Sequence, residues 1–187
     1  MNHLLSKIGS YPFEKLNLLH KDIKPSKDVI NLSIGEPKLN ADSKVLDILK
    51  KEASSFSNYP PMNAIPELSE AYRQYLESHF GIKNVAEDEV CLVAGTREGT
   101  FSIIQALFNK ENVKDKPYVV MPNPFYQIYG GATTLAGGEA KFLDCPEEDN
   151  FQPDLGSLKS EDWQKCQILV LCSPNNPTGS VLPLSKL

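Results

Sequence analysis

Strand-like and helix-like segments alternate along the second half of the chain. The expected strands are rich in apolar and β-branched residues and cover 90–94, 118–121, 140–144 and 167–172. The expected helices between them carry apolar residues at helical spacing and cover 97–109, 125–136 and 155–165. Because a helix lies between each strand and the next, successive strands can run parallel, with helices on both faces of the sheet. The pattern therefore predicts an α/β fold with a mainly parallel sheet.

The first part of the chain has a different pattern. A short helix is expected at Pro12 to His20, followed by a polar connector and an extended piece over 29–34. Apolar residues at helical spacing predict another helix around 45–53, and Pro66 is a typical first residue of the next one. We expect residues 1–40 to form an N-terminal arm with a contribution to a small domain, and residues 41–187 to form the first part of a larger domain.

Composition excludes several classes of function. The 187 residues are 41% hydrophobic and carry a net charge of −5, without the basic cluster that nucleic-acid binding requires. The four cysteines show no C-x-x-C spacing, so neither a zinc site nor a disulfide framework is expected. The three histidines are scattered, which argues against a catalytic triad. No signal peptide or membrane span is expected at the start, and we predict a soluble, cytoplasmic protein.

The loop from Ser173 to Gly179 follows directly on a buried-strand run. Its sequence, Ser-Pro-Asn-Asn-Pro-Thr-Gly, places side-chain amides where the strand ends. Open α/β sheets bind ligands at the carboxyl ends of their strands. The loop is therefore a candidate site, although Asn, Pro and Gly are also the ordinary residues of turns.

A second candidate element lies around Gly95, between an expected strand and an expected helix. Glycine lets the backbone approach a ligand closely, and the free N–H groups and positive end of the helix converge on one point. A phosphate group would fit there, with contacts from Thr96 and Arg97. The alternative is a plain turn in which Thr96 caps the helix.

A third element runs from Met121 to Tyr129. Two prolines after the strand hold the chain extended, and aromatic residues follow at once. One ring can therefore be presented rigidly at the carboxyl end of the strand. Packing into the core is the competing interpretation, and we expect it for Phe125 and Tyr129.

Taken together, these strings resemble the motifs of the fold-type I, class I aminotransferases, which depend on pyridoxal 5'-phosphate (PLP). The resemblance implies a PLP cofactor and the large-domain fold of that family. It implies that Gly95, Thr96 and Arg97 form the phosphate cup, that Tyr126 stacks on the pyridine ring, and that Asn176 bonds the ring oxygen. No catalytic residue is assigned within the chain.

Two upstream segments extend the resemblance. The string from Tyr59 to Leu68 is similar to a family segment whose tyrosine reaches the cofactor phosphate of a neighbouring subunit, which implies a homodimer. Ala64 and Ser69 depart from the Gly and Arg of that pattern. The string from Asn31 to Pro37 is similar to the family arm, in which Gly35 would lie near the substrate.

In the family, the Schiff-base lysine, the pyridine-pairing Asp and the carboxylate-binding Arg follow the loop that ends at Gly179. None of the 17 lysines occupies the family position, so we expect that lysine beyond Leu187 and interpret this chain as the amino-terminal portion of the enzyme, inactive by itself.

The segments 94–101 and 122–132 look most like succinyldiaminopimelate aminotransferases, with small amino-acid and 2-oxo-acid substrates in lysine biosynthesis. Two alternatives remain open. One is another PLP enzyme of the same fold, such as a lyase or a decarboxylase, and the other is a non-catalytic module that binds a phosphate-bearing ligand.

Overall fold

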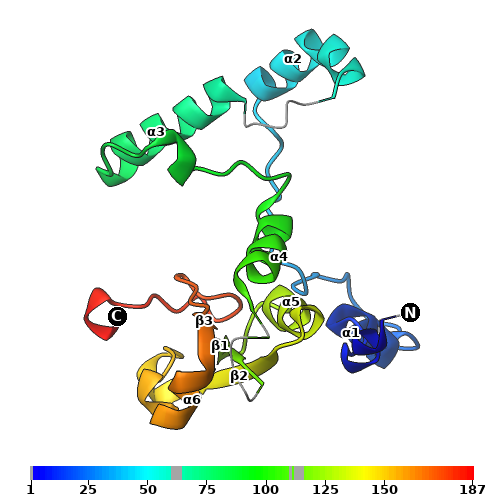
Figure 1. Cartoon of the computed structure of the whole chain (residues 1–187). Coiled ribbons are helices and arrows are strands. Elements are labelled where there is room, and N and C mark those ends of the chain that lie inside the picture. Colours follow the sequence, from blue (N-terminus) through cyan, green and yellow to red (C-terminus); the bar gives the residue numbers. More distant parts are fainter. Residues whose placement is uncertain (1, 60–64, 110, 112–115) are drawn as a thin grey trace. The chain divides into compact units, whose positions relative to one another are not determined.

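The computed structural model describes residues 2–59, 65–109, 111 and 116–187 (Figure 1). The chain divides into two compact units. Residues 1–10 and 93–187 form the first, and residues 11–92 form the second. The domain boundary predicted between residues 40 and 41 stays a prediction.

The second unit consists of helices and extended connections. Its α-helices are α1 (Pro12–His20), α2 (Ser43–Lys51) and α3 (Pro66–Phe80), and its 3-10 helices are η2 (Ala53–Ser57) and η3 (Glu87–Glu89). The Asp42 carboxylate caps α2 by accepting the Lys44 N–H at 2.8 Å. Pro66 begins α3, and Gly81 ends it in the left-handed conformation with φ of 68°. The bounds predicted for α1 are confirmed.

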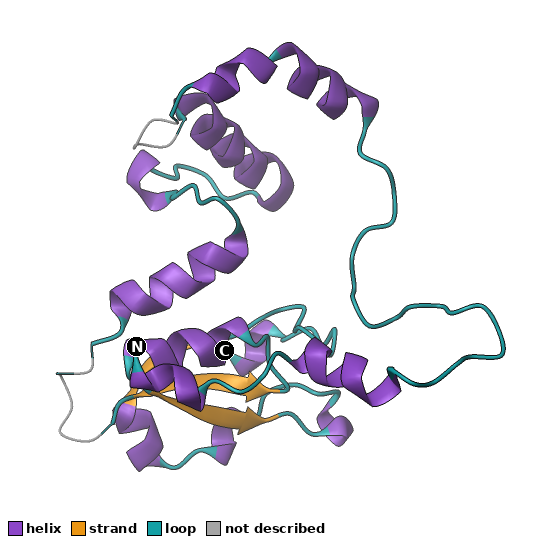
Figure 2. Ribbon diagram, turned by 90° about the vertical axis from the view of Figure 1, so that its right-hand side faces the viewer, coloured by secondary structure: helices purple, strands orange, loops and turns teal. Residues whose placement is uncertain are grey.

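The first unit contains a three-stranded parallel sheet, whose strands run side by side in one direction (Figure 2). The strands are β1 (Tyr118–Asn123), β2 (Glu139–Asp144) and β3 (Cys166–Leu169), in the order β2-β1-β3. The α-helices are α4 (Thr96–Leu107), α5 (Ile128–Ala136) and α6 (Ser160–Lys165). Short 3-10 helices complete the unit: η1 (His3–Lys7), η4 (Glu147–Asp149), η5 (Leu155–Ser157) and η6 (Leu184–Lys186).

The core of this unit lies around the central strand. Val119, Val120 and Met121 of β1 are fully buried, as a strand paired on both sides and covered by helices should be. Phe108 and Tyr129 pack in the same cluster. Helices α4 and α5 are also joined by a 2.7 Å hydrogen bond from the Gln105 side chain to the backbone carbonyl of Ala132.

A register shift interrupts the pairing of β1 with β3. Tyr118 pairs with Cys166 and Val119 with Ile168, so Gln167 has no opposite residue in β1. Its side chain pairs instead with the backbone just after α4. Gln167 Oε1 accepts the Asn109 N–H at 2.8 Å, and Gln167 Nε2 donates to the Asn109 carbonyl at 2.6 Å.

Several predicted bounds were wrong. Residues 90–94 form no strand, because no described segment pairs with them. The helix predicted over 155–165 is two short pieces, since the backbone is extended at Leu158 and Lys159. Helix α5 begins at Ile128 rather than at Phe125, which lies outside it with its ring stacked on Phe142. The last strand ends at Leu169 rather than at Cys172.

Among the described residues, no helix has both the length and the apolar character that crossing a bilayer requires.

Candidate active site

The start of α4 presents backbone N–H groups without a side-chain cap. Gly95 precedes the helix with φ of 135° and ψ of 142°, a conformation that side chains strongly disfavour. The first helical bond is the 3.0 Å contact from the Gly99 N–H to the Gly95 carbonyl. The N–H groups before Gly99 therefore have no partner within the helix, and Thr96 and Arg97 are both exposed beside them. This end of the helix has the geometry and the partial positive charge to hold an anion.

Glu98 belongs to the same turn, and the sequence motif assigned it no role. One carboxylate oxygen, Oε2, lies 2.8 Å from the point where a Cβ on Gly95 would stand. Glu98 is the third residue of α4, from which a glutamate side chain can reach back over the helix start. The signal was available, because an acidic residue at that position is typical of a helix N-terminus. A phosphate bound at this turn would compete with the Glu98 carboxylate for the same positive end.

Tyr126 lies between β1 and α5 with its ring half-buried against the core. The ring meets Tyr129 edge-on, with centroids 5.7 Å apart and planes at 89°. Tyr129 is a buried core residue, as predicted, and Phe125 is a packing residue stacked on Phe142 at 5.2 Å. Tyr129 is thus buried, whereas Phe125 and Tyr126 are both half-buried against the core cluster, and the stacking role expected for Tyr126 stays a prediction.

A contact between Tyr129 and Cys172 joins this segment to the Ser173–Gly179 loop. Burial raises the pKa of Tyr129 to about 12, and the charge and hydrogen bond of Cys172 act in the same direction. The Cys172 thiol in turn donates to the Pro174 carbonyl, with an Sγ to O distance of 3.1 Å. Tyr129, whose ring meets Tyr126, therefore lies near Cys172, the residue that precedes the loop. Forty-three positions separate Tyr129 from Cys172, and no local pattern predicts the pair.

Within the loop, Asn176 is exposed while its neighbour Asn175 is buried. The Asn175 N–H donates to the Ser180 carbonyl at 2.8 Å, and the Gly179 N–H donates to the Asn175 carbonyl at 2.7 Å. Asn175 Nδ2 donates to Thr178 Oγ1 at 3.0 Å. These bonds close the loop and leave the side chain of Asn176 accessible to a ligand.

Tyr59 and Gly35 belong to the second unit. Tyr59 is fully exposed, and a Cβ added at Gly35 would meet no atom within 4 Å. Ala64 lies outside the described residues. A hollow of about 370 Å³ in this unit is lined by residues between Asn17 and Ser33 and contains neither Tyr59 nor Gly35. The roles expected for both residues stay predictions.

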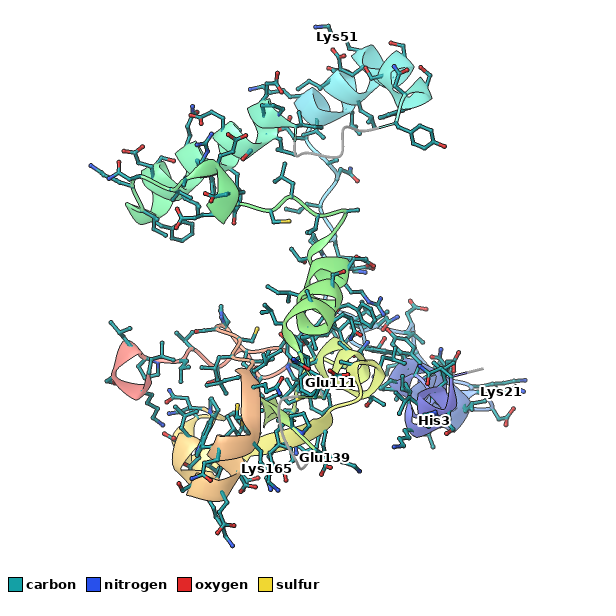
Figure 3. All side chains as sticks on the ribbon, viewed as in Figure 1. His3, Lys21, Lys51, Glu111, Glu139 and Lys165 are labelled. Carbon is teal, nitrogen blue, oxygen red and sulfur yellow. The ribbon has the colours of Figure 1, made fainter. Side chains whose placement is uncertain are left out.

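The surroundings of four of the described lysines can be stated. Figure 3 shows Lys51 and Lys21 pointing outward from the second unit. In the first unit, Lys141 Nζ lies 3.0 Å from Asp162 Oδ1, and this partner raises the pKa of Lys141 and lowers that of Asp162. Lys141 and Lys165 both lie over the ring of Tyr118, at 5.6 and 5.8 Å from its centroid. Both amines thus lie beside an aromatic ring, and Lys141 also has an acidic partner.

The first unit therefore supplies an uncapped helix start, a half-buried aromatic ring and a loop that exposes an amide. An anionic group can bind the first, a flat ring can lie on the second, and a polar ring substituent can bond the third. A flat, phosphate-bearing molecule has the chemistry that this set of groups recognises.

Comparisons with known proteins agree with this chemistry. The family model for aminotransferase class I and II matches residues 27–187. The chain is 29% identical over 182 residues to LL-diaminopimelate aminotransferase of Natranaerobius thermophilus and 30% identical over 184 residues to LL-diaminopimelate aminotransferase 2 of a Nostoc species. Each comparison covers 96% of this chain and 46% of the relative. The chain thus spans about half the length of these relatives.

Solved structures give the same result. The crystal structure of an aminotransferase from Neisseria meningitidis is similar with a TM-score of 0.89 and 39% identity, over 100% of this chain and 47% of that one. Aminotransferase AspB from Helicobacter pylori has a TM-score of 0.85 and 33% identity, over 96% of this chain and 46% of that one. The predicted α/β fold is confirmed.

Proposed function

The chain belongs to the family of class I and II aminotransferases, and we propose that the protein it forms part of transfers an amino group between an amino acid and a 2-oxo acid. The family membership carries this proposal, together with the uncapped start of α4 that its cofactor would need. We further propose that the protein works in the cytoplasm, in the synthesis of lysine.

The family depends on PLP, and the cofactor predicted from the sequence is thereby confirmed for the family. The residues present fit that group. The backbone at Gly95 has no Cβ to block an approaching phosphate, and the helix start beyond it lacks a side-chain cap. The half-buried ring of Tyr126 and the exposed amide of Asn176 suit the cofactor ring and its oxygen. When bound, PLP supplies an electron sink that stabilises the carbanion left when an amino acid loses its α-proton.

The work of the residues is then to bind and to orient. N–H groups at the start of α4, with the hydroxyl of Thr96 and the cationic Arg97, would anchor the phosphate. Tyr126 would hold the ring plane, and Asn176 would donate a hydrogen bond to the ring oxygen. Glu98 would have to turn away from Gly95 or stay close to the bound anion, so its charge would limit the affinity of the cup.

For the substrate, we propose N-succinyl-LL-2,6-diaminopimelate as amino donor and 2-oxoglutarate as acceptor. The proposal is supported by the likeness of residues 94–101 and 122–132 to enzymes of that specificity. The curated relatives are named for LL-diaminopimelate itself, which shares the diamino-diacid skeleton but lacks the succinyl group. The two donors differ by one charge-bearing acyl group, so one assay can separate them.

The test uses the full-length protein with PLP. We expect saturable binding, followed by an absorbance change, and glutamate formation from 2-oxoglutarate when the succinylated donor is added. Faster turnover of free LL-diaminopimelate than of the succinylated donor would instead assign to this protein the substrate for which the relatives are named. A protein that shows no cofactor absorbance after saturation with PLP would contradict the proposed function as a whole.

We also propose that the lysine that holds the cofactor lies beyond Leu187, and that residues 1–187 alone do not catalyse transamination. Borohydride reduction of the PLP-loaded full-length protein, followed by peptide mapping, should place the label on one such lysine. The same treatment of residues 1–187 should label exposed lysines at low yield. Stoichiometric labelling of one lysine within residues 1–187, with turnover, would contradict this assignment.

A further inference from the structure

Asn175 is buried in the middle of an otherwise accessible loop. Its exposed fraction is 5%, whereas Pro174, Asn176 and Pro177 around it are exposed. Burying an amide is unfavourable unless its polar groups find partners, so a buried Asn in a surface loop indicates a specific task. Neither the sequence motif nor the proposed cofactor contacts give it one.

The contacts of Asn175 join the first half of the loop to its end. Its backbone N–H and carbonyl bond Ser180 and Gly179, at 2.8 and 2.7 Å. Its side-chain Nδ2 donates to Thr178 Oγ1 at 3.0 Å, and the same oxygen accepts the Ser180 N–H at 3.3 Å. Asn176 lies inside this ring of bonds, outside any helix or strand. The direction of its side chain therefore depends on how the loop is closed.

From this geometry we propose that Asn175 positions Asn176 for the cofactor, an inference that rests on the proposed function. Two side-chain hydrogen bonds of described loop residues span Asn176. The Ser173 hydroxyl accepts the Leu182 N–H at 3.0 Å across the whole loop, and the Asn175 amide donates to the Thr178 hydroxyl directly around Asn176. Without the bond between Asn175 and Thr178, the loop keeps its backbone bonds but gains freedom at residues 176 and 177. Asn176 would then meet the cofactor oxygen for a smaller fraction of the time.

The remaining polar atom of this side chain supports a role in the assembled site. Asn175 Oδ1 is buried, and no hydrogen-bond donor reaches it among the described residues. A buried acceptor without a partner is unfavourable, and a donor approaching the closed loop would relieve that cost. The Asn175 amide can therefore donate to Thr178 through Nδ2 and accept a further hydrogen bond at Oδ1.

The experiment uses the full-length protein with PLP as the probe. We expect Asn175→Ala to weaken PLP affinity about 2- to 10-fold, the effect of one hydrogen bond. Thr178→Val should weaken it at least as much, because the Thr178 hydroxyl also accepts the Ser180 N–H. The double variant should lose less than the product of the two, because both changes remove the same bond. Thr178→Ser keeps the hydroxyl and should restore the affinity. Thr134→Val is the matched control, since the Thr134 hydroxyl bonds the Gly130 carbonyl within its own helix.

A second readout separates positioning from simple stability. If Asn175 orients the Asn176 amide toward the ring oxygen, the absorbance of bound PLP should follow a shifted pH profile in Asn175→Ala. A lower melting temperature of the apo-protein with unchanged PLP affinity and an unchanged pH profile would overturn the inference. Wild-type protein that binds no PLP would overturn the proposed function, and this inference with it.

Discussion

Replacing Gly95 by alanine tests whether backbone conformation builds the candidate phosphate cup. Gly95 has φ of 135° and ψ of 142°, and it stands immediately before α4. An alanine there meets two obstacles. The backbone conformation is one that a residue with a Cβ rarely adopts, and the new Cβ would lie 2.8 Å from Glu98 Oε2.

The two obstacles differ in size. Glu98 Oε2 is the far end of a flexible, exposed side chain, and rotating it away forfeits at most the helix-dipole interaction of about 0.3–1 kcal/mol. The backbone strain costs about 1–3 kcal/mol and cannot be relieved by rotating a side chain. A gain of about 0.4–1 kcal/mol from the stiffer unfolded chain offsets part of it. We therefore expect a net loss of about 1–2 kcal/mol in the free energy of unfolding, set mainly by φ.

Urea unfolding and PLP titration of the full-length protein measure the two consequences. PLP affinity should fall at least about tenfold, because relaxing the strain turns the first N–H groups of α4 away from the anion. The matched control is Gly131→Ala, since a Cβ at Gly131 within α5 meets nothing within 4 Å. That change should leave the stability unchanged or raise it by up to about 1 kcal/mol.

The double change Gly95→Ala with Glu98→Ala identifies which obstacle dominates. If backbone strain dominates, removing the Glu98 carboxylate should not restore stability. Full recovery in the double variant would show that the steric contact was the cause. Unchanged stability and affinity in Gly95→Ala would refute the role assigned to this conformation.

Three further outcomes are expected. Tyr59→Phe should lower the affinity of a homodimeric full-length enzyme for PLP by about 1.5–3 kcal/mol if its hydroxyl reaches the partner's cofactor phosphate, and a competent monomer in size measurements would exclude that role. The pKa of Tyr129 rises from 10.0 to about 12, so the neutral phenol stabilises the folded state fully below pH 10, and this contribution is lost as the pH rises toward 12. In Tyr129→Phe, the urea concentration at half-unfolding should therefore depend less on pH between 10 and 12 than in the wild type. Gly138→Ala should cost about 1–3 kcal/mol by urea unfolding, because its Cβ would lie 2.4 Å from Cζ of the buried Phe108.

Local rules predicted the elements whose limits are local. Pro12 and Pro66 begin α1 and α3 because proline lacks the N–H that a first helical residue does not use. The turn at Gly95 was equally readable, since strand-like residues, a glycine and a helical pattern follow one another. The α/β class followed from the alternation of segments with different periodicity.

What failed depended on partners that a local pattern does not contain. Residues 90–94 have strand composition, but a strand needs a neighbour, and none of the described segments pairs with them. The split of the helix expected over 155–165 followed from extended backbone at Leu158 and Lys159 that apolar spacing does not encode. The sequence predicts a turn around Asn175 and Asn176 but does not indicate which of the two is buried. The proposed role of Asn175 could therefore be inferred only from the hydrogen bonds of the folded loop.

The hydrogen bonds of the Gln167 side chain lead to an expectation about mutations at this position. By bonding both backbone groups of Asn109, this side chain fastens the exit of α4 to the sheet, about 18 Å along that helix from Thr96. We therefore expect residue 167 to influence the candidate phosphate cup, although it is not among the proposed cofactor contacts. Mutations at codon 167 that shorten this side chain or remove its amide should surface as temperature-sensitive alleles, and their suppressors should map to residues facing α4.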